Sequence, residues 1–140
     1  MSKVAVVYWS GTGNTEIMAK AIVDGAKENG AEAELFTSAE FNADKMDSFD
    51  AVAFGCPAMG AEELEDSEFQ PMFNDCVPKL SGKKIALFGS YGWGDGEWMR
   101  IWEADCKEKG AVLACDSLIL NETPDDDGIE SCKVVGRALC

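Results

Sequence analysis

Residues 10–15 of this chain read Ser-Gly-Thr-Gly-Asn-Thr, and this stretch decides the fold. It follows the continuous apolar run Val4–Trp9 and precedes an amphipathic pattern that begins at Glu16. A strand, a short turn rich in glycine and hydroxyl residues, and the start of a helix together present backbone N–H groups and the positive end of a helix dipole to an anion. The stretch therefore predicts a phosphate site between a first strand and a first helix.

The composition of this turn limits the kind of phosphate. A loop that binds a nucleoside triphosphate carries Gly-Lys-Ser or Gly-Lys-Thr, and a dinucleotide loop has a third glycine where this chain has Glu16. Four of the six residues instead offer hydroxyl or amide groups, and none is basic. We therefore expect one terminal phosphate monoester, bound by neutral donors.

The chain is strongly acidic, because its 140 residues carry a formal net charge of −14 at pH 7. Its length is typical of a single domain with its own core, so we expect residues 1–140 to form one domain. Nucleic acids and anionic membranes would repel such a chain, whereas a basic protein would be attracted to it. Net charge also keeps proteins soluble, so composition alone leaves a basic partner and a solubility role equally open.

Several classes of site are disfavoured by residues and segments that the sequence lacks. It has no histidine, which removes Ser-His-Asp triads and histidine metal sites. None of its six cysteines forms a Cys-x-x-Cys pair, so we expect no metal site and interpret the cysteines as structural thiols. No stretch has the roughly twenty apolar residues of a membrane span. No charged and apolar leader precedes the first strand, so we expect a cytoplasmic protein.

Strand and helix patterns alternate along the chain. Short apolar runs predict five strands, at Lys3–Trp9, Glu32–Phe36, Ala51–Gly55, Lys84–Ser90 and Val112–Leu120. Apolar residues at helical spacing predict four longer helices, with stripes at Ile17, Met18, Ala21, Ile22 and Ala26; at Phe69, Met72, Phe73, Cys76 and Val77; at Trp98, Ile101, Trp102 and Cys106; and at Ile129, Cys132, Val135, Gly136 and Leu139. The region Phe41–Phe49 predicts a further, short helix.

Local signals mark the ends of these helices. Asn29-Gly30 is a suitable stop for the first one, and Gly110 for the one that contains Trp98. Ser67 and Gln70 have the spacing of a capping box at the start of the helix with Phe69. The alternation as a whole predicts an α/β fold, an open parallel sheet with helices on both faces.

Ligands of open parallel sheets bind outside the carboxyl ends of the strands, so the loops after the first, third and fourth strands are the candidates. Residues 56–65 read Cys-Pro-Ala-Met-Gly-Ala-Glu-Glu-Leu-Glu, and residues 90–96 read Ser-Tyr-Gly-Trp-Gly-Asp-Gly. The residues alone leave two roles open for Trp93, which is either a packing residue or a glycine-framed platform for a planar ring. In the second case Met59 could cover the opposite face of that ring.

Together these three loops resemble those of the flavodoxins, small electron carriers that use FMN, and the resemblance extends from the first strand to the last helix. The fifth strand lacks the long insertion of larger members, so the chain resembles the short-chain type. The family implies a three-layer α/β/α sandwich whose five-stranded parallel sheet has the order 2-1-3-4-5. It also implies an electron carrier that uses FMN, and the acidity of the chain leads us to expect a low-potential one-electron carrier that shuttles between the semiquinone and hydroquinone. We expect a monomer, because transient redox contacts are small. The same acidity favours basic redox proteins, reductases or oxidoreductases, as partners in transient complexes.

The resemblance assigns the FMN site residue by residue. Residues 10–15 would hold the phosphate, and Glu62 would accept a hydrogen bond from the flavin N3–H. Trp93 and Met59 would enclose the isoalloxazine ring. The complete set of expected cofactor-binding residues is Ser10, Gly11, Thr12, Gly13, Asn14, Thr15, Pro57, Ala58, Met59, Gly60, Glu62, Ser90, Tyr91, Gly92, Trp93 and Gly94. Asn121 and Glu122 are expected near the site without a defined role.

Two features carry the expected redox behaviour. Glycine tolerates positive φ, so the Met59-Gly60 peptide could reverse and offer its carbonyl to the flavin N5–H, which is the switch that the family implies. Carboxylates beside the ring would repel the negative charge of the fully reduced flavin and lower its potential. The residues expected to do so are Glu62, Glu63, Glu65, Asp66 and Glu68.

Two alternatives to a carrier remain open at this stage. One is a flavodoxin-like NAD(P)H:quinone reductase, which would need a nicotinamide or quinone pocket over a ring that Trp93 is expected to cover on one face. The other is a receiver-like module without a redox cofactor, which would need a phosphorylatable aspartate at the end of the third strand. Residues 55–57 read Gly-Cys-Pro at that point, so the second alternative is disfavoured.

Overall fold

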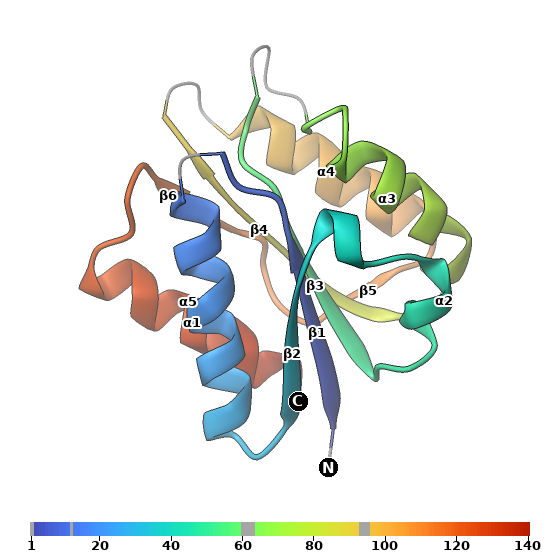
Figure 1. Cartoon of the computed structure of the whole chain (residues 1–140), viewed down its shortest axis with the longest axis horizontal. Coiled ribbons are helices and arrows are strands. Elements are labelled where there is room, and N and C mark those ends of the chain that lie inside the picture. Colours follow the sequence, from blue (N-terminus) through green and yellow to red (C-terminus); the bar gives the residue numbers. More distant parts are fainter. Residues whose placement is uncertain (1, 12, 60–63, 93–95) are drawn as a thin grey trace.

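A parallel β-sheet forms the middle layer of the protein, with helices packed on both of its faces (Figure 1). The computed structural model describes residues 2–11, 13–59, 64–92 and 96–140. The strands are β1 (Lys3–Tyr8), β2 (Glu32–Thr37), β3 (Ala51–Gly55), β4 (Lys84–Tyr91), β5 (Val112–Leu113) and β6 (Leu118–Asn121). The α-helices are α1 (Asn14–Glu28), α2 (Ala43–Met46), α3 (Phe69–Cys76), α4 (Glu97–Glu108) and α5 (Asp126–Ala138). The expected three-layer α/β/α sandwich is confirmed.

The sheet has the order β2-β1-β3-β4-β5, with β6 also paired to β4, and every pairing is parallel. This is the order that the resemblance implied. β3 is buried along its whole length and β4 everywhere except at its ends. Strands covered on both faces need apolar side chains in both directions, which explains their continuous apolar runs.

The sequence predicts one uninterrupted fifth strand, Val112–Leu120. This prediction is wrong, because residues 114–117 separate β5 from β6. Lys84 lies opposite Val112, whereas Phe88 lies opposite Leu118, so four steps along β4 correspond to six along the fifth strand. Two residues must therefore leave the ladder, as in a β-bulge. The interruption contains the exposed Asp116, whose carboxylate favours solvent over a sheet interior.

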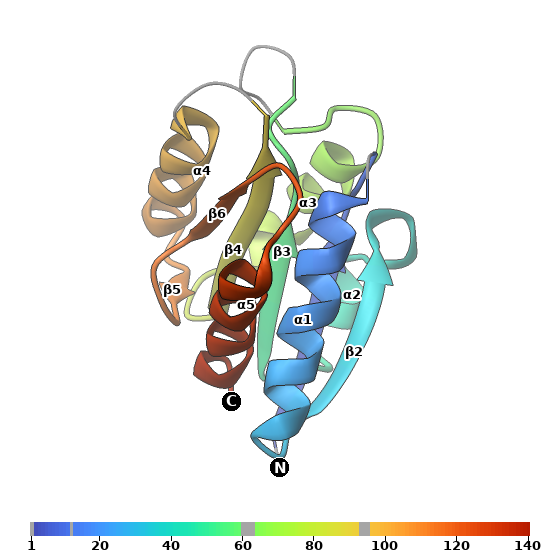
Figure 2. The same cartoon turned by 90° about the vertical axis from the view of Figure 1, so that its left-hand side faces the viewer.

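On one face of the sheet, α1 and α5 approach each other closely (Figure 2). A Cβ added to Gly25 would lie 2.2 Å from the carbonyl oxygen of Lys133, and one added to Gly136 would lie 2.1 Å from that of Ile22. Backbones can pack at this distance only where glycine removes the side chain. The pair of glycines therefore fixes how α5 lies on α1.

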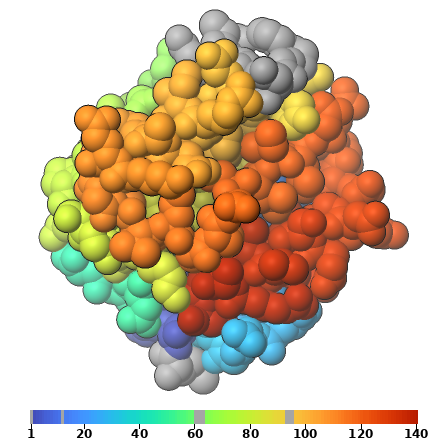
Figure 3. All heavy atoms as spheres, turned by 180° about the vertical axis from the view of Figure 1, so that it is seen from behind, coloured from blue at the N-terminus to red at the C-terminus, as the bar shows by residue number. Residues whose placement is uncertain are grey.

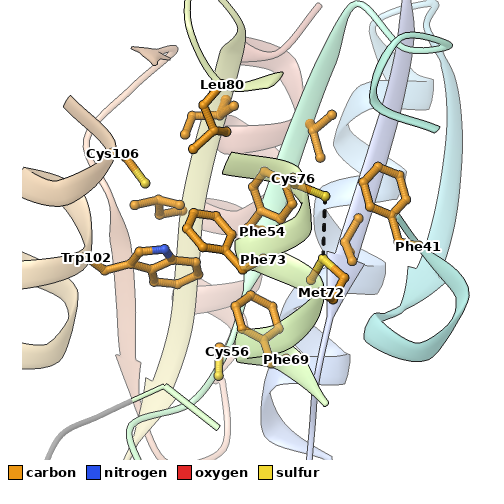
Figure 4. Close-up of a cluster of buried hydrophobic side chains, with 14 of the residues drawn as sticks. Phe41, Phe54, Cys56, Phe69, Met72, Phe73, Cys76, Leu80, Trp102 and Cys106 are labelled. Carbon is orange, nitrogen blue, oxygen red and sulfur yellow. Dashed lines mark hydrogen bonds between the residues drawn. The ribbon is translucent and has the colours of Figure 1, made fainter. Parts of the chain in front are cut away.

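On the opposite face, α3 and α4 pack against the sheet through a cluster of aromatic rings (Figure 4). Phe73 of α3 stands perpendicular to Phe54 of β3 at a ring-centroid distance of 5.2 Å. Trp102 of α4 lies 5.5 Å from both Phe69 and Phe73, edge to face. Such pairs contribute about 0.5–1.5 kcal/mol beyond the burial of apolar area.

Two residues of the predicted apolar stripes are exposed. Ile17 is 38% exposed and Ile101 is 60% exposed. The buried face of α4 centres on Trp98 and Trp102, which are one turn apart, and Ile101 lies to the side of that line. In α1, Ile17 likewise lies to the side of the buried line formed by Met18 and Ile22.

Glu65 caps the start of α3, and the predicted capping box of Ser67 and Gln70 is wrong. The Glu65 carboxylate accepts hydrogen bonds from the backbone N–H groups of Ser67 (2.9 Å), Glu68 (2.8 Å) and Phe69 (2.8 Å), and from the Ser67 hydroxyl. The Gln70 amide donates instead to Asn74 Oδ1. A charged acceptor that reaches three N–H groups satisfies the helix start better than a serine hydroxyl, which reaches one.

The carboxyl ends of the strands lie at one edge of the sheet, at the top of Figures 1 and 2. Figure 3 shows the molecule from behind, where α4 and the C-terminal segment with α5 form most of the surface. Within the described ranges, no helix combines the length and the apolar character that crossing a membrane requires. All six cysteines are free thiols.

Candidate functional site

A cavity of about 500 Å³ opens at the carboxyl ends of the strands, where the order of the sheet reverses between β1 and β3. This is the position at which open parallel sheets bind their ligands. The three predicted loops line it, together with a segment after β6. The lining residues are Trp9, Gly11, Asn14, Pro57, Ala58, Met59, Ser90, Tyr91, Gly92, Glu122 and Thr123.

The first loop leaves the start of α1 open toward this cavity. Gly13 is the N-cap residue, with φ 95°, and no side chain caps the helix there. Among the described residues, the first N–H group of this turn with a backbone acceptor is that of Ile17, which donates to Gly13 O at 3.1 Å. Since the N–H groups before it lack an acceptor within the helix, they are available to an anion.

Two other helices, α5 and α2, are capped by a side chain, whereas α4 begins as α1 does, at a glycine with positive φ (Gly96, 87°) and without such a cap. The start of α1 differs from that of α4 in that it lines the cavity, through Gly11 and Asn14. Asp125 Oδ1 accepts from the N–H of Gly128 at the start of α5 (2.8 Å), and Asn42 Oδ1 accepts from Lys45 at the start of α2 (3.2 Å). In the α1 loop, Ser10 Oγ accepts from the Gly13 N–H at 3.0 Å and so shapes the turn rather than capping the helix. The open helix start is what a phosphate group needs.

Thr15 connects the first loop to the fourth strand. Its hydroxyl shares a hydrogen bond of 2.8 Å with the Ser90 hydroxyl, and both side chains are buried. The Thr15 hydroxyl is therefore directed at Ser90, while its backbone N–H belongs to the open helix start. The predicted Thr15 and Ser90 thus lie together, but the hydroxyls contact each other.

The second and third loops are joined at the cavity by backbone hydrogen bonds. The Ala58 N–H donates to Ser90 O at 3.0 Å, and the Cys56 N–H donates to Phe88 O at 3.1 Å. These bonds extend the β3–β4 pairing past the end of β3. They place Pro57, Ala58 and Met59 on one wall of the cavity beside Tyr91.

The segment after β6 forms a wall that the sequence only partly indicated. The Glu122 N–H donates to Tyr91 O at 2.7 Å, and Glu122 has φ 55°, the left-handed region that an L residue occupies at a cost. The Thr123 hydroxyl donates to Asn14 Oδ1 at 3.1 Å and thereby closes the cavity between this segment and the α1 loop. Glu122 was expected near the site and lines it, whereas Thr123 was missed.

Trp9 is a second lining residue that sequence reasoning missed, because it was counted as the last residue of the first strand. It lies beyond β1, its N–H donates to Gly55 O at 3.1 Å, and its ring reaches back over the loop. A Cβ added to Gly11 would come within 3.2 Å of that ring. An aromatic residue at the carboxyl end of a strand, next to a glycine turn, is the signal that could have found it.

Several predicted residues line the cavity together, and they come from all three loops: Gly11, Asn14, Pro57, Ala58, Met59, Ser90, Tyr91 and Gly92. Ser10, Gly13 and Thr15 belong to the same α1 loop and shape it by the contacts given above. The remaining predicted residues lie outside the described residues; they are Thr12, Gly60, Glu62, Trp93 and Gly94. Among the described residues, no group of three or more Cys, Asp and Glu side chains could hold a metal ion.

Glu65 was expected among the carboxylates beside the ring, and in the structure its side chain is buried. It is 5% exposed, and burial by itself would raise the pKa of its carboxyl. The hydrogen bonds from Ser67, Phe69 and Glu68 outweigh burial and lower the pKa to about 2. Its charge is therefore directed into the start of α3, where those donors compensate it.

Comparison with known proteins shows close relatives over nearly the whole chain. The family model described as flavodoxin matches residues 6–134. The flavodoxin of Megasphaera elsdenii is 50% identical over 135 residues, which cover 96% of each chain. That of Clostridium beijerinckii is 47% identical over 121 residues, covering 86% of this chain and 88% of the relative. Among solved structures, the two-electron reduced Megasphaera elsdenii flavodoxin in solution superposes with a TM-score of 0.89, at 49% identity and 97% coverage of each chain.

Proposed function

The chain belongs to the flavodoxin family, and we propose that it works as a low-potential one-electron carrier whose FMN lies in the cavity at the carboxyl edge of the sheet. Proteins of this family bind FMN and transfer electrons rather than catalyse a reaction of their own. The membership therefore favours a carrier over a quinone reductase. The finer proposal is that the working couple is the semiquinone and hydroquinone of FMN, which supplies the reversible one-electron chemistry when bound.

The cavity fits such a cofactor in size and in the chemistry of its walls. Its volume of about 500 Å³ lies within the range of about 300–1,000 Å³ that is usual for ligand pockets. One end is the open start of α1, which suits a phosphate, and the other has the apolar and aromatic side chains of Met59 and Tyr91. We propose that the α1 loop holds the phosphate through backbone N–H groups and neutral side chains.

The open start of α1 is the observation that carries this proposal. A helix start without a side-chain cap leaves N–H groups that need an acceptor, and this one faces a cavity. Basic side chains are absent from residues 10–15, so a bound phosphate keeps most of its negative charge. That suits a cofactor that stays bound and is not hydrolysed.

We also propose which residues contact the isoalloxazine ring of FMN, and one of them, Met59, belongs to the part of the chain that the structure describes. Met59 lines the cavity, and we propose that it covers one face of the isoalloxazine ring, with Trp93 on the other and Glu62 accepting from N3–H. Gly60 would allow the Met59-Gly60 peptide to present its carbonyl to N5–H. In Gly60→Ala we expect a lower yield of the one-electron reduced form; an unchanged yield would remove the switch from the proposal.

Acidic residues near the cavity would lower the potential of the second electron. Glu122 lines the cavity, and a carboxylate ~10 Å from the ring opposes an added negative charge by about 1–2 kcal/mol at an effective dielectric constant of ~20, less when solvated. Since the Glu65 charge is compensated by its hydrogen bonds, we expect the remaining acids to contribute about 2–3 kcal/mol. At ~59 mV per 1.4 kcal/mol, this corresponds to roughly 85–130 mV.

The net charge of the protein supports a proposal about its partners. With a net charge of −14, the protein would attract basic redox proteins and repel nucleic acids and anionic membranes. Transient redox contacts are small, so a monomer suffices. The six free thiols suit the reducing conditions of a cytoplasm, where we place the carrier.

The experiment that tests the proposal uses the FMN-loaded protein as electron acceptor and donor. We expect NADPH alone to leave the flavin absorbance unchanged and a flavin-dependent reductase with NADPH to bleach it. The reduction rate should fall as salt is added, because screening weakens the attraction of a basic reductase. Direct reduction by NADPH at a catalytic rate would instead identify an enzyme.

A further inference from the structure

The second loop of the cavity is held at its base by contacts between the residues that flank it. This loop begins at Pro57 after β3 and ends at Leu64 before α3, and Met59 lies on its cavity side. Cys56 precedes the loop and Glu65 follows it. Neither residue lines the cavity, yet both are buried, at 0% and 5% exposure.

The Cys56 backbone is fixed from two sides. Its N–H donates to Phe88 O at 3.1 Å, and its carbonyl oxygen accepts from Trp98 Nε1 of α4 at 3.3 Å. A Cβ added to Gly89 of β4 would lie 2.2 Å from that same carbonyl oxygen, so the chain passes directly over β4. The loop therefore leaves the sheet from a rigid point.

The Cys56 thiol joins this point to the other end of the loop. Its Sγ accepts a hydrogen bond from the Glu65 N–H at 3.3 Å, and its S–H donates to Pro57 O at 3.5 Å. Burial raises the pKa of the thiol to about 12, so the S–H donor persists at neutral pH. The thiol thus contacts the first residue of the loop and the first residue after it.

Glu65 is in turn fixed to α3. Its carboxylate accepts from Glu68 and Phe69 N–H groups at 2.8 Å, and its carbonyl oxygen accepts from Gln70 at 2.9 Å. Figure 4 shows Cys56 and Phe69 at the same edge of the aromatic cluster. The two ends of the loop are therefore joined to each other and to the core.

We propose that Cys56 and Glu65 are positioning residues, which close the base of this loop so that Met59 is held at the cavity and FMN binds tightly. The inference rests on the proposed function, since it names residues that act on FMN through the loop and without contacting the cofactor. A loop whose ends are held loses less conformational freedom when a ligand orders it, so closure favours affinity. The structure also supplies a matched control. Cys106 of α4 is equally buried in the same cluster and lies at its opposite side (Figure 4).

The test compares Cys56→Ala with Cys106→Ala, which delete the same atoms from the same core. Amide hydrogen exchange at the Glu65 N–H is measured in the apoprotein, and the dissociation constant of FMN is measured by quenching of its fluorescence. In Cys56→Ala we expect the exchange rate at the Glu65 N–H to rise more than about tenfold over the parent, after correction for any change in global unfolding. We also expect FMN to bind about tenfold more weakly than to the parent. In Cys106→Ala both values should stay within about twofold of the parent.

Equal exchange rates and equal FMN affinities in the two variants would overturn the proposal. If Cys56→Ala does not fold, Cys56→Val and Cys106→Val, which keep a side chain of similar volume and, at position 56, remove the hydrogen bonds of the sulfur, are compared in the same way. The exchange measurement needs no FMN, so it reports on the closure of the loop even if the proposed carrier function fails. Conversely, a parent protein that binds FMN and accepts electrons while both variants behave alike would overturn this inference alone.

Discussion

The hydroxyl groups of Thr15 and Ser90 share a hydrogen bond of 2.8 Å, although 75 residues separate them in the chain. Thr15 belongs to the first turn of α1, and Ser90 is the penultimate residue of β4. The bond therefore ties the proposed phosphate end of the cavity to the strand that leads to its aromatic end. Both groups are buried, so each depends on the other as a partner.

We predict that Thr15→Val destabilises the protein by about 1–2 kcal/mol, because it leaves the buried Ser90 hydroxyl without this partner. Ser90→Ala should have a similar effect, and the double variant should cost less than the sum of the two, with a coupling of about 1 kcal/mol. Denaturant unfolding of the four apoproteins measures this cycle. Strict additivity would show that the bond contributes nothing of its own.

Gly13→Ala is predicted to weaken FMN binding about tenfold or more, because a Cβ disfavours the φ of 95° that places the following N–H groups at the cavity. Gly30→Ala is the matched control. Gly30 has φ 88°, and a Cβ at either glycine would meet no atom of the described residues within 4 Å, so we expect both variants to carry backbone strain alone. Calorimetric titration of each apoprotein with FMN should show the loss only in Gly13→Ala. An equal loss in both would indicate general destabilisation.

The stability that Glu65 provides should depend on pH. The pKa of Glu65 in the folded protein is about 2, below its unfolded value of about 4.3, so the folded state binds this proton less readily. The contribution is therefore fully present above the unfolded pKa and is lost as pH falls through the folded pKa. We expect Glu65→Gln to cost about 2 kcal/mol at pH ~6 and progressively less toward pH ~2. A difference between parent and variant that stays constant over this interval would contradict the carboxylate cap.

Glu122→Gln should raise the potential of the second electron by about 20–50 mV at low salt, because it removes a negative charge from the wall of the cavity. The shift should shrink as salt is added. Glu32→Gln is the control, because Glu32 begins β2 at the opposite edge of the sheet and should leave the potential unchanged. The two potentials are measured by redox titration of each FMN-loaded protein. Equal shifts in the two variants would mean that position relative to the cavity does not matter.

Much of the fold could be predicted because its signals are local. Ala51–Gly55 is a strand with the bounds expected from its apolar run, and Gly30 ends α1 as its place after Asn29 indicated. The break at residues 114–117 could not be predicted, since it is a difference in length between the fifth strand and β4 that no single segment contains. In the same way, the cap of α3 comes from Glu65, whose reach to three N–H groups depends on how the preceding loop enters the helix.

The candidate site was predictable where a loop motif follows a strand, as for Asn14, Ala58 and Tyr91, which line the cavity. Thr123 was missed because its role arises from a hydrogen bond to Asn14, 109 residues earlier. No pattern in its own segment indicates that contact. Contacts of this kind, between residues far apart in the chain, follow from the order of the strands in the sheet. They can therefore be recognised only once the fold is known.

The central claim, that the protein is a low-potential one-electron carrier, is tested most directly by redox titration of the FMN-loaded protein, with absorbance spectra recorded at each potential. We predict two separate one-electron steps, the second lying roughly 100 mV or more below that of free FMN and moving upward as salt is added. A single two-electron step at the potential of free FMN, insensitive to salt, would contradict the carrier.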